Sequence, residues 1–502
     1  MHVGMILEMA ADSLADRVAI GSRSDGMTYA DLGHHARRAG TYLAGAHGTR
    51  VVFVDENSPA SPIALYGAAI AGKPFAPVNY RLADDRLRAI IERTAPATVI
   101  AGEGVAARLE GVRDIEIIGR DEFLVAATDA GVEETDGWGC DPEAIAVLLF
   151  TSGTTGEPKA AVLRHMNLAS YLVGSLEFGA AGEDEAAVVS VPPYHIAAVS
   201  SVLSTTYVGR RVVLLESFDP KEWVRVVRAE SVTHAMVVPT MLNRILDVVA
   251  ADGDGLPSMR SLAYGGGPMP RPVVERALAL LPSLDLVNAY GLTETSSTVA
   301  VLGPEEHRAA FASGAPSVRA RLGSVGQPLP GIELSVRDPS GAAVPPGETG
   351  EIWVRGDQVS GEYLGLAGDD GREGWFNTRD AGYVDDEGYL FVSGRLDDVI
   401  VRGGENLSPG EIEQVLVDHP AVDVAAVVGI PDVEWGERVV AAVVLVPGAT
   451  VTEDDLRDHV RAQLRSARTP DRIAVYAELP FTETGKLLRR VLREELADTF
   501  AG

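Results

Sequence analysis

Cysteine is nearly absent from this chain of 502 residues. The only one, Cys140, has no partner for an intramolecular disulfide, so a disulfide-stapled fold is excluded and nothing suggests an oxidising compartment. The sequence also lacks an apolar run of the roughly 20 residues that a membrane helix needs, since Pro192 and Pro193 interrupt the best candidate, Val188–Leu203. Acidic residues near the N-terminus are not typical of a secretory signal. We therefore expect a cytoplasmic protein without membrane insertion.

Positive charge is scarce as well. The chain has 43 Lys and Arg against 72 Asp and Glu, a net charge of −29. A surface this acidic repels phosphate backbones and anionic lipid headgroups, so we expect no nucleic-acid partner. If the substrate is itself a polyphosphate, positive charge must be concentrated in one cleft.

Among the basic residues, lysine is the rare one: the four are Lys73, Lys159, Lys221 and Lys486. An ammonium is a compact point charge that fits between several oxygens, whereas a guanidinium is a broad planar fork. These lysines are therefore candidates for positions where an arginine does not fit, and a solvated lysine is the alternative interpretation for Lys73 and Lys221.

From about residue 28 to residue 300, short apolar runs alternate with amphipathic helical stretches. The runs are Val51–Val54, Thr98–Ala101, Ala144–Phe150, Ala186–Val191, Arg211–Leu215, Ala235–Val238 and Leu284–Ala289. This rhythm predicts βαβ units around buried sheets. From about 320 to 395 the pattern changes to strands joined by the turn-forming segments Asp338–Gly341 and Asp385–Gly388, which predict hairpins.

A compact α+β pattern follows Arg395. It predicts strands at Val399–Arg402, Val422–Ile430, Arg438–Val446 and Arg472–Leu479, and helices from Ser408 and over Thr452–Leu464. Because the chain is also longer than one domain usually grows, we predict a boundary near Asp397, with domains of residues 1–396 and 397–502.

The strand Ala144–Phe150 leads into Thr151–Lys159, the sequence TSGTTGEPK. Gly153 and Gly156 allow positive φ and close backbone approach, the hydroxyls and successive N–H groups can donate to oxygens, and Lys159 adds charge. The spacing differs from that of a Walker loop. We predict a phosphate-binding loop; a surface connection rich in Ser, Thr and Gly is the alternative.

This loop resembles the signature of the adenylate-forming superfamily, which includes acyl-CoA synthetases, nonribosomal-peptide adenylation domains and firefly luciferase. Similar motifs follow in the family's order at Tyr264–Gly267, Asn288–Glu294, Trp375–Asp380, Gly394–Asp398, Gly403–Asn406 and Thr484–Lys486. The resemblance implies an α/β fold: a large N-terminal domain of βα-wound sheets with a small β-barrel-like subdomain, and a smaller, mobile α+β C-terminal domain.

The resemblance also implies a nucleotide site. Its residues are Thr151, Ser152, Gly153, Thr154, Thr155, Gly156, Lys159, Gly265, Gly266, Gly267, Asn288, Tyr290, Asp380 and Arg395. Adenine would lie between the glycines 265–267 and the ring of Tyr290, with Asn288 near its amino group, because glycines leave a flat slot that an aromatic face closes. Asp380 would accept the ribose hydroxyls and Arg395 would support the ribose and phosphate.

The catalytic residues that the resemblance implies are Thr293 at the α-phosphate, Glu294 as the ligand of Mg²⁺, and Lys486 between the attacking carboxylate and the phosphate. For the second step the small domain would rotate about Asp397 and bring Gly403 and Gly404 against a pantetheine tunnel.

The segments expected around the acyl group are lined by small residues. The predicted pocket consists of His195, Ala197, Ala198, Gly265 and Gly267, and His195 is also a candidate catalytic residue, although a structural histidine is an equal alternative. Small walls leave room, which favours an aromatic, cyclic or fatty acid over acetate.

The resulting hypothesis is an AMP-forming acyl-CoA synthetase that uses ATP, Mg²⁺ and coenzyme A on a carboxylic acid and releases AMP and pyrophosphate. A protein with one half-reaction, or one that loads a carrier protein, is an alternative. So is an NAD-binding dehydrogenase, suggested by the G-x-G-x-x-A of Gly102–Ala107. The sequence leaves open whether the chain forms a homodimer. It departs from the family at Ala160 and Arg379, where glycine is usual.

Overall fold

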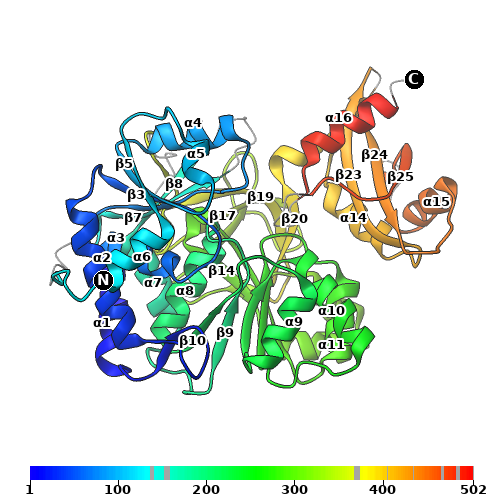
Figure 1. Cartoon of the computed structure of the whole chain (residues 1–502). Helices are drawn as coiled ribbons and strands as arrows, with labels where there is room; N and C mark the ends of the chain where they lie inside the picture. Colours follow the sequence, from blue (N-terminus) through cyan, green and yellow to red (C-terminus); the bar gives the residue numbers. More distant parts are fainter. Residues whose placement is uncertain are drawn as a thin grey trace.

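The computed structural model describes residues 1–135, 141–151, 159–366, 374–403, 405–433, 435–464, 468–481 and 487–500. Two large sheets form the N-terminal part of the chain, and a separate α+β unit follows them (Figure 1). The predicted α/β fold is thereby confirmed. Among the described residues, no helix is both long and apolar enough to cross a membrane.

The first sheet has seven strands in the order β18-β8-β7-β4-β3-β5-β6. These are β3 (Arg50–Val54), β4 (Phe75–Pro77), β5 (Ala97–Ala101), β6 (Ile115–Gly119), β7 (Ile145–Thr151), β8 (Lys159–Arg164) and β18 (Glu362–Tyr363). Strands β3 to β6 are parallel to their neighbours, as the alternating strands and helices predict, whereas β8 turns back antiparallel to β7.

The second sheet has nine strands in the order β15-β14-β13-β12-β11-β9-β10-β1-β2. These are β1 (Val18–Ile20), β2 (Met27–Thr28), β9 (Ala186–Val189), β10 (Arg211–Leu214), β11 (His234–Val237), β12 (Ser261–Gly265), β13 (Asp285–Leu292), β14 (Ser297–Leu302) and β15 (Gln327–Pro328). Strands β9 to β13 run parallel, so the loops that follow them meet at one edge of the sheet.

The helices of this part are α1 (Val3–Ser13), α2 (Tyr29–Gly45), α3 (Ala60–Ile70), α4 (Asp84–Thr94), α5 (Val105–Arg108), α6 (Arg120–Thr128), α7 (His165–Ser175), α8 (Ile196–Val208), α9 (Pro220–Ala229), α10 (Pro239–Asp252), α11 (Arg271–Leu280), α12 (Pro304–Ala312) and α13 (Pro316–Ala320). Helices α3 and α8 are apolar on nearly every side and buried, as expected for helices enclosed within a domain. The largest hydrophobic cluster takes in both of these helices together with strands of both sheets.

A four-stranded antiparallel sheet follows, in the order β16-β17-β19-β20. Its strands are β16 (Glu333–Arg337), β17 (Gly350–Arg355), β19 (Phe376–Val384) and β20 (Leu390–Arg395). The turn-forming segment Asp385–Gly388 joins β19 to β20 in a hairpin, as predicted. The pairing order is open at both ends in the described residues, so this subdomain is a small sheet where a barrel-like arrangement was expected.

The C-terminal unit is built on β21 (Ile400–Arg402), β22 (Glu405–Leu407), β23 (Val422–Asp432), β24 (Gly436–Leu445) and β25 (Arg472–Tyr476), with helices α14 (Pro409–Val417), α15 (Glu453–Gln463) and α16 (Arg489–Thr499). Its two hydrophobic clusters contain only residues from 400 onward. The boundary near Asp397 agrees with these clusters but stays a prediction. Contacts with the N-terminal part include the ion pair of Arg271 with Asp418, 3.1 Å, and the hydrogen bond from Ser408 to the Ser393 carbonyl, 2.7 Å.

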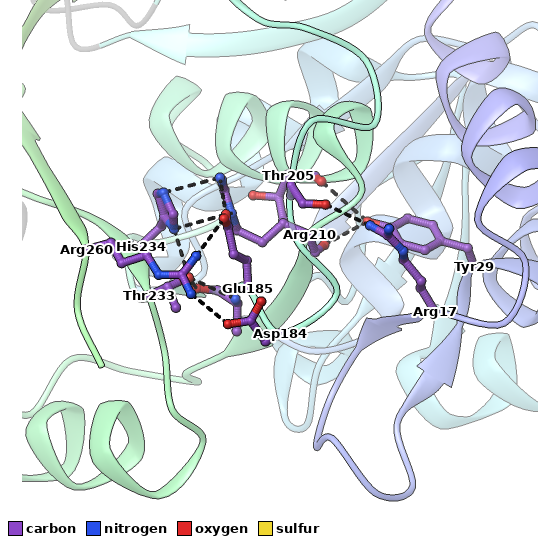
Figure 2. Close-up of polar contacts among 11 residues, drawn as sticks. Arg17, Tyr29, Asp184, Glu185, Thr205, Arg210, Thr233, His234 and Arg260 are labelled. Carbon is purple, nitrogen blue, oxygen red and sulfur yellow. Dashed lines mark hydrogen bonds and ion pairs between the residues drawn. The ribbon is translucent and has the colours of Figure 1, made fainter. Parts of the chain in front are cut away.

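An ion-pair network lies at the amino ends of the parallel strands of the nine-stranded sheet (Figure 2). Glu185 precedes β9 and accepts hydrogen bonds from Arg210, which precedes β10, at 2.9 and 3.0 Å, and from Arg260, which precedes β12, at 2.9 Å. Tyr29 of α2 donates to the carbonyl of Arg210 at 2.7 Å and so connects the network to the core. We call this group the Glu185 network; it ties together the sheet edge opposite the loops described next.

Candidate active site

The predicted site residues of the nine-stranded sheet follow the carboxyl ends of its parallel strands. His195 comes after β9, the glycines 265–267 begin at the last residue of β12, and Thr293 and Glu294 lie in the 3-10 turn that follows β13. In open α/β sheets, ligands bind in the crevice outside this edge. The parallel strand order therefore brings segments up to 100 residues apart in the sequence to the same edge of the sheet.

The glycines 265–267 meet the backbone requirement that the sequence suggests. A Cβ on Gly265 would overlap the carbonyl oxygen of Ala289 on β13, and Gly266 has a φ of +79°. Asn288 is 9% exposed and its side-chain nitrogen donates to the Ser324 carbonyl at 3.0 Å, which orients the amide. Gly265 thus permits the close approach of β12 to β13, and the Asn288 amide is held in place on the neighbouring strand.

Tyr290, Asp380 and Arg395 form one cluster between β13 and the four-stranded sheet. The hydroxyl of Tyr290 donates to Oδ2 of Asp380 at 2.6 Å, and Nε of Arg395 lies 3.2 Å from Oδ1. Burial, together with the Asp380 carboxylate, raises the pKa of Tyr290, so the phenol keeps its proton. Asp380 is itself 7% exposed, and as a buried acceptor it is suited to sugar hydroxyls.

Glu294 and Lys159 both contact Tyr363, a residue that the sequence motifs did not indicate. The Tyr363 hydroxyl donates to Oε1 of Glu294 at 2.6 Å, and Nζ of Lys159 lies 5.3 Å from the centre of its ring. Burial and the Glu294 carboxylate raise the pKa of Tyr363, while the charges of Arg395 and Arg379 lower it. The charge of Arg395, which pairs with Asp380, therefore also acts on Tyr363.

The ends of the phosphate loop are paired across β7 and β8. Thr151 and Lys159 are opposite each other in the antiparallel register, and the Thr151 hydroxyl donates to the Lys159 carbonyl at 3.4 Å. Thr151 and Lys159 are therefore held together at one end of this strand pair, and Lys159 lies beside Tyr363. Ser152, Gly153, Thr154, Thr155 and Gly156 lie outside the described residues, as do Gly404 and Lys486.

His195 begins α8 as its N-terminal cap and lies against Tyr194, with ring centres 4.7 Å apart. Burial lowers the pKa of His195 from 6.5 to about 4, so the imidazole is neutral at physiological pH and serves as an uncharged wall or acceptor. Ala197 accepts hydrogen bonds from the Ser200 and Ser201 hydroxyls, and Ala198 is 4% exposed.

In the C-terminal unit, Asp397 lies in a short 3-10 helix, Leu396–Asp398, directly after β20. Gly403 has a φ of +57°, its N–H donates to the Trp435 carbonyl at 2.8 Å, and a Cβ there would press on the Trp435 ring. The glycine is required by this close approach.

Arg379, one of the departures from the family pattern, has a φ of +61°. This left-handed conformation costs a non-glycine residue about 1–2 kcal/mol, which explains why glycine is usual at this position. We expect Arg379→Gly to raise the free energy of unfolding by about 1 kcal/mol, since the Arg379 side chain is exposed. Urea denaturation measures the change.

Arg379→Ala is the matched control, because it removes the same charge and side chain but keeps the Cβ that makes the backbone strained. A gain from the alanine variant equal to that from glycine would assign the effect to the lost charge and contradict the strain argument.

Tyr363 is the functional-site residue that the sequence does not indicate. It lies on the two-residue strand β18, 69 residues from Glu294, and no local motif links the two. A helix of four residues, α5, follows Gly102–Gly104, so the dehydrogenase alternative lacks the long helix whose N-terminus binds a pyrophosphate.

Comparison with known families matches residues 7–364 to the family described as AMP-binding enzyme and residues 411–486 to AMP-binding enzyme C-terminal domain. A feruloyl-CoA synthase from Amycolatopsis is 34% identical over 478 residues, 93% of each chain. A fatty acid–[acyl-carrier-protein] ligase, ScoC, from Streptomyces coeruleorubidus is 32% identical over 483 residues, which are 93% of this chain and 91% of ScoC.

Among solved structures, o-succinylbenzoate CoA synthetase from Bacillus subtilis is similar in two complexes. With its acyl-adenylate intermediate it matches with a TM-score of 0.83 at 28% identity, over 97% of both chains. With ATP and magnesium the TM-score is 0.81 at 27% identity, over 97% of this chain and 98% of that one.

Proposed function

Because this chain belongs to the family of AMP-binding enzymes, we propose that it is an acyl-CoA synthetase that adenylates a carboxylic acid with ATP and then transfers the acyl group to coenzyme A. The observation that supports the proposal is a set of contacts at the end of β13: Tyr290 bonds to Asp380, and Glu294 bonds to Tyr363, whose ring lies beside Lys159. The glycines 265–267 lie at the same edge of the sheet. A phosphate loop, a ribose acceptor and a metal-binding carboxylate belong to one nucleotide site.

In this proposal the adenine ring lies on the side-chain-free surface of the glycines 265–267, beside Tyr290. Asp380 accepts hydrogen bonds from the ribose hydroxyls, and the guanidinium of Arg395 is near both the ribose and the α-phosphate. Tyr290 already donates to Asp380, which holds the carboxylate in one orientation before the sugar arrives. Thr293 donates to the α-phosphate, where charge develops as pyrophosphate leaves.

The oxygen atoms available at Glu294 are suitable ligands for Mg²⁺. The Glu294 carboxylate is 7% exposed, one of its oxygens is held by Tyr363, and the triphosphate supplies further hard oxygens. When bound, Mg²⁺ supplies charge neutralisation for the triphosphate. Lys159 lies beside the ring of Tyr363, which bonds to this carboxylate, and it would supply the positive charge that a polyphosphate needs within an acidic protein.

Thioester formation requires that the acyl carbon become accessible to a thiol. We assign this step to a rotation of residues 397–502 about Asp397, with Gly403 and Gly404 lining the path of the pantetheine arm. The similarity to ScoC favours a second candidate acceptor, the same thiol arm on an acyl-carrier protein. The cytoplasmic location expected from the sequence agrees with either acceptor and is part of the proposal.

The substrate that we propose is a bulky acid, aromatic or fatty. Ala197 and Ala198 offer small side chains, and the uncharged His195 beside them supplies no cation for a second carboxylate. An enclosed cavity of about 10 Å³ behind Ala198 holds no more than one water and adds no length to the acyl pocket.

A panel of ferulate, o-succinylbenzoate, decanoate and acetate tests the proposal, with pyrophosphate release and thioester formation followed separately. We expect release with a bulky acid to exceed release with acetate at least about tenfold, since each extra buried methylene contributes about 1 kcal/mol of binding. Running each acid with coenzyme A and with an acyl-carrier protein identifies the acceptor. If acetate is fastest the pocket argument is wrong, and if no acid releases pyrophosphate the proposed function is wrong.

A further inference from the structure

Tyr363 occupies the junction of the proposed metal and phosphate groups. Its hydroxyl donates to Oε1 of Glu294 at 2.6 Å, and the face of its ring is 5.3 Å from the ammonium of Lys159. One side chain therefore touches both the carboxylate proposed to bind Mg²⁺ and the cation at the end of the phosphate loop.

The backbone around Tyr363 is fixed from two directions. The N–H groups of Ser360 and Gly361 donate to the carbonyl of Glu294 at 2.9 and 3.2 Å, and the Ser360 hydroxyl donates to the Val162 carbonyl of β8. Tyr363 then pairs with Ala161 of β8 in antiparallel register. The segment thus joins the 3-10 turn that carries Glu294 to the strand that begins with Lys159, and the ring of Tyr363 has little freedom to move.

The hydrogen bond decides how Glu294 can bind a cation. With Oε1 accepting the hydrogen bond from the phenol, the rotation of the carboxylate is set, and Oε2 would be turned toward a bound cation. Carboxylates that ligate metals are usually held by such an outer hydrogen bond, and losing it typically lowers metal affinity or activity 10- to 100-fold.

We propose that Tyr363 is a positioning residue for the adenylation step, whose hydroxyl holds Glu294 in the orientation that binds Mg²⁺ and whose ring supports Lys159 against the phosphates. The inference rests on the proposed function, because it takes Mg²⁺ with ATP as the ligand. It assigns to Tyr363 no contact with substrate. Its effect is confined to the first half-reaction, since pyrophosphate has left before the thiol attacks.

Tyr363→Phe separates the two contacts, because it removes the hydroxyl and keeps the ring below Lys159. ATP binding is measured by titration calorimetry over a series of Mg²⁺ concentrations, independently of turnover. We expect the Mg²⁺ concentration for half-maximal ATP affinity to rise about 10-fold or more in this variant. Thioester formation from a preformed acyl-adenylate should keep its wild-type rate.

The control is Tyr383→Phe, which removes a hydroxyl from a tyrosine of β19 whose ring stacks on Phe391 at 4.8 Å. It should leave the Mg²⁺ dependence unchanged. Tyr363→Leu, which also removes the ring, should weaken ATP binding further at saturating Mg²⁺, as the support of Lys159 is lost.

An unchanged Mg²⁺ dependence in Tyr363→Phe, with ATP binding and turnover normal in the wild type, overturns the inference alone and makes the contact purely structural. Equal slowing of both half-reactions overturns it too. Failure of the wild-type protein to bind ATP with Mg²⁺ at all overturns the proposed function, and the inference with it.

Discussion

Replacing Lys486 by alanine is expected to slow adenylate formation from acid and ATP by about a hundredfold or more. The reason is electrostatic: an ammonium placed between the attacking carboxylate and the α-phosphate offsets negative charge that increases as pyrophosphate leaves, and losing one such preorganised donor typically costs this much. Pyrophosphate release under single-turnover conditions measures the effect. Lys486 lies outside the described residues, so the prediction rests on its motif, Thr484–Lys486.

The same variant should form thioester from a preformed adenylate at nearly the wild-type rate, because that step needs the lysine to be away from the reacting carbon. Lys221→Ala is the control lysine variant, since Lys221 is exposed on the first turn of α9. Loss of both half-reactions to the same extent in Lys486→Ala would contradict the division of labour between the two steps.

Glu185→Ala is expected to lower the free energy of unfolding by about 3 kcal/mol. The carboxylate is the common acceptor for Arg210 and Arg260, and the Arg210 side chain is 18% exposed, so the substitution leaves a largely buried guanidinium without its counter-charge. Denaturant unfolding of the purified variant measures the change. The Glu185 network is at the edge of the sheet opposite the site, so adenylation by the folded fraction should be unaffected.

Glu222→Ala is the matched control, because it removes a glutamate from an ion pair that is exposed to solvent. Its partner Arg225 is 65% exposed and Glu222 is 44% exposed, so we expect no measurable change in stability. Similar losses from the two variants would mean that the network adds nothing beyond an ordinary surface ion pair.

Much of the fold follows from local pattern. The run Val51–Val54 lies within β3, and Arg211–Leu215 corresponds to β10, because strands buried on both faces are continuous apolar runs that need no knowledge of their neighbours. The four predicted C-terminal strands correspond to β21, β23, β24 and β25 within a few residues, whereas the short strand β22 was not predicted. Strand β18 escapes prediction, since two residues carry no periodicity and form a strand only because β8 is beside them.

For the site as well, sequence motifs indicate single residues, and only the fold shows which residues are in contact. Motifs indicated Glu294 and Asp380, but their partners come from other segments: Tyr363 bonds to Glu294 across 69 residues and Tyr290 to Asp380 across 90. Arg379 is an intermediate case. The sequence shows an arginine where glycine is usual, and only the backbone φ explains the usual glycine.

Lysine usage was informative in part. Lys73, for which the alternative was a solvated side chain, donates to the carbonyls of Leu43 and Ala46 at 2.7 and 2.9 Å and so satisfies the carboxyl end of α2. Scarcity therefore points to a position that needs a compact cation in the case of Lys73, whereas Lys221 is exposed.

The contact between Arg271 and Asp418 bears on the proposed rotation of the C-terminal unit, which must separate them. Both side chains are partly exposed, 36% and 22%, so the bond contributes about 1 kcal/mol or less and dissolved ions weaken it. This ion pair is therefore a weak contact between the two parts of the chain, and salt in solution weakens it further. In the proposed rotation, we therefore expect higher ionic strength to favour the orientation in which Arg271 and Asp418 are apart.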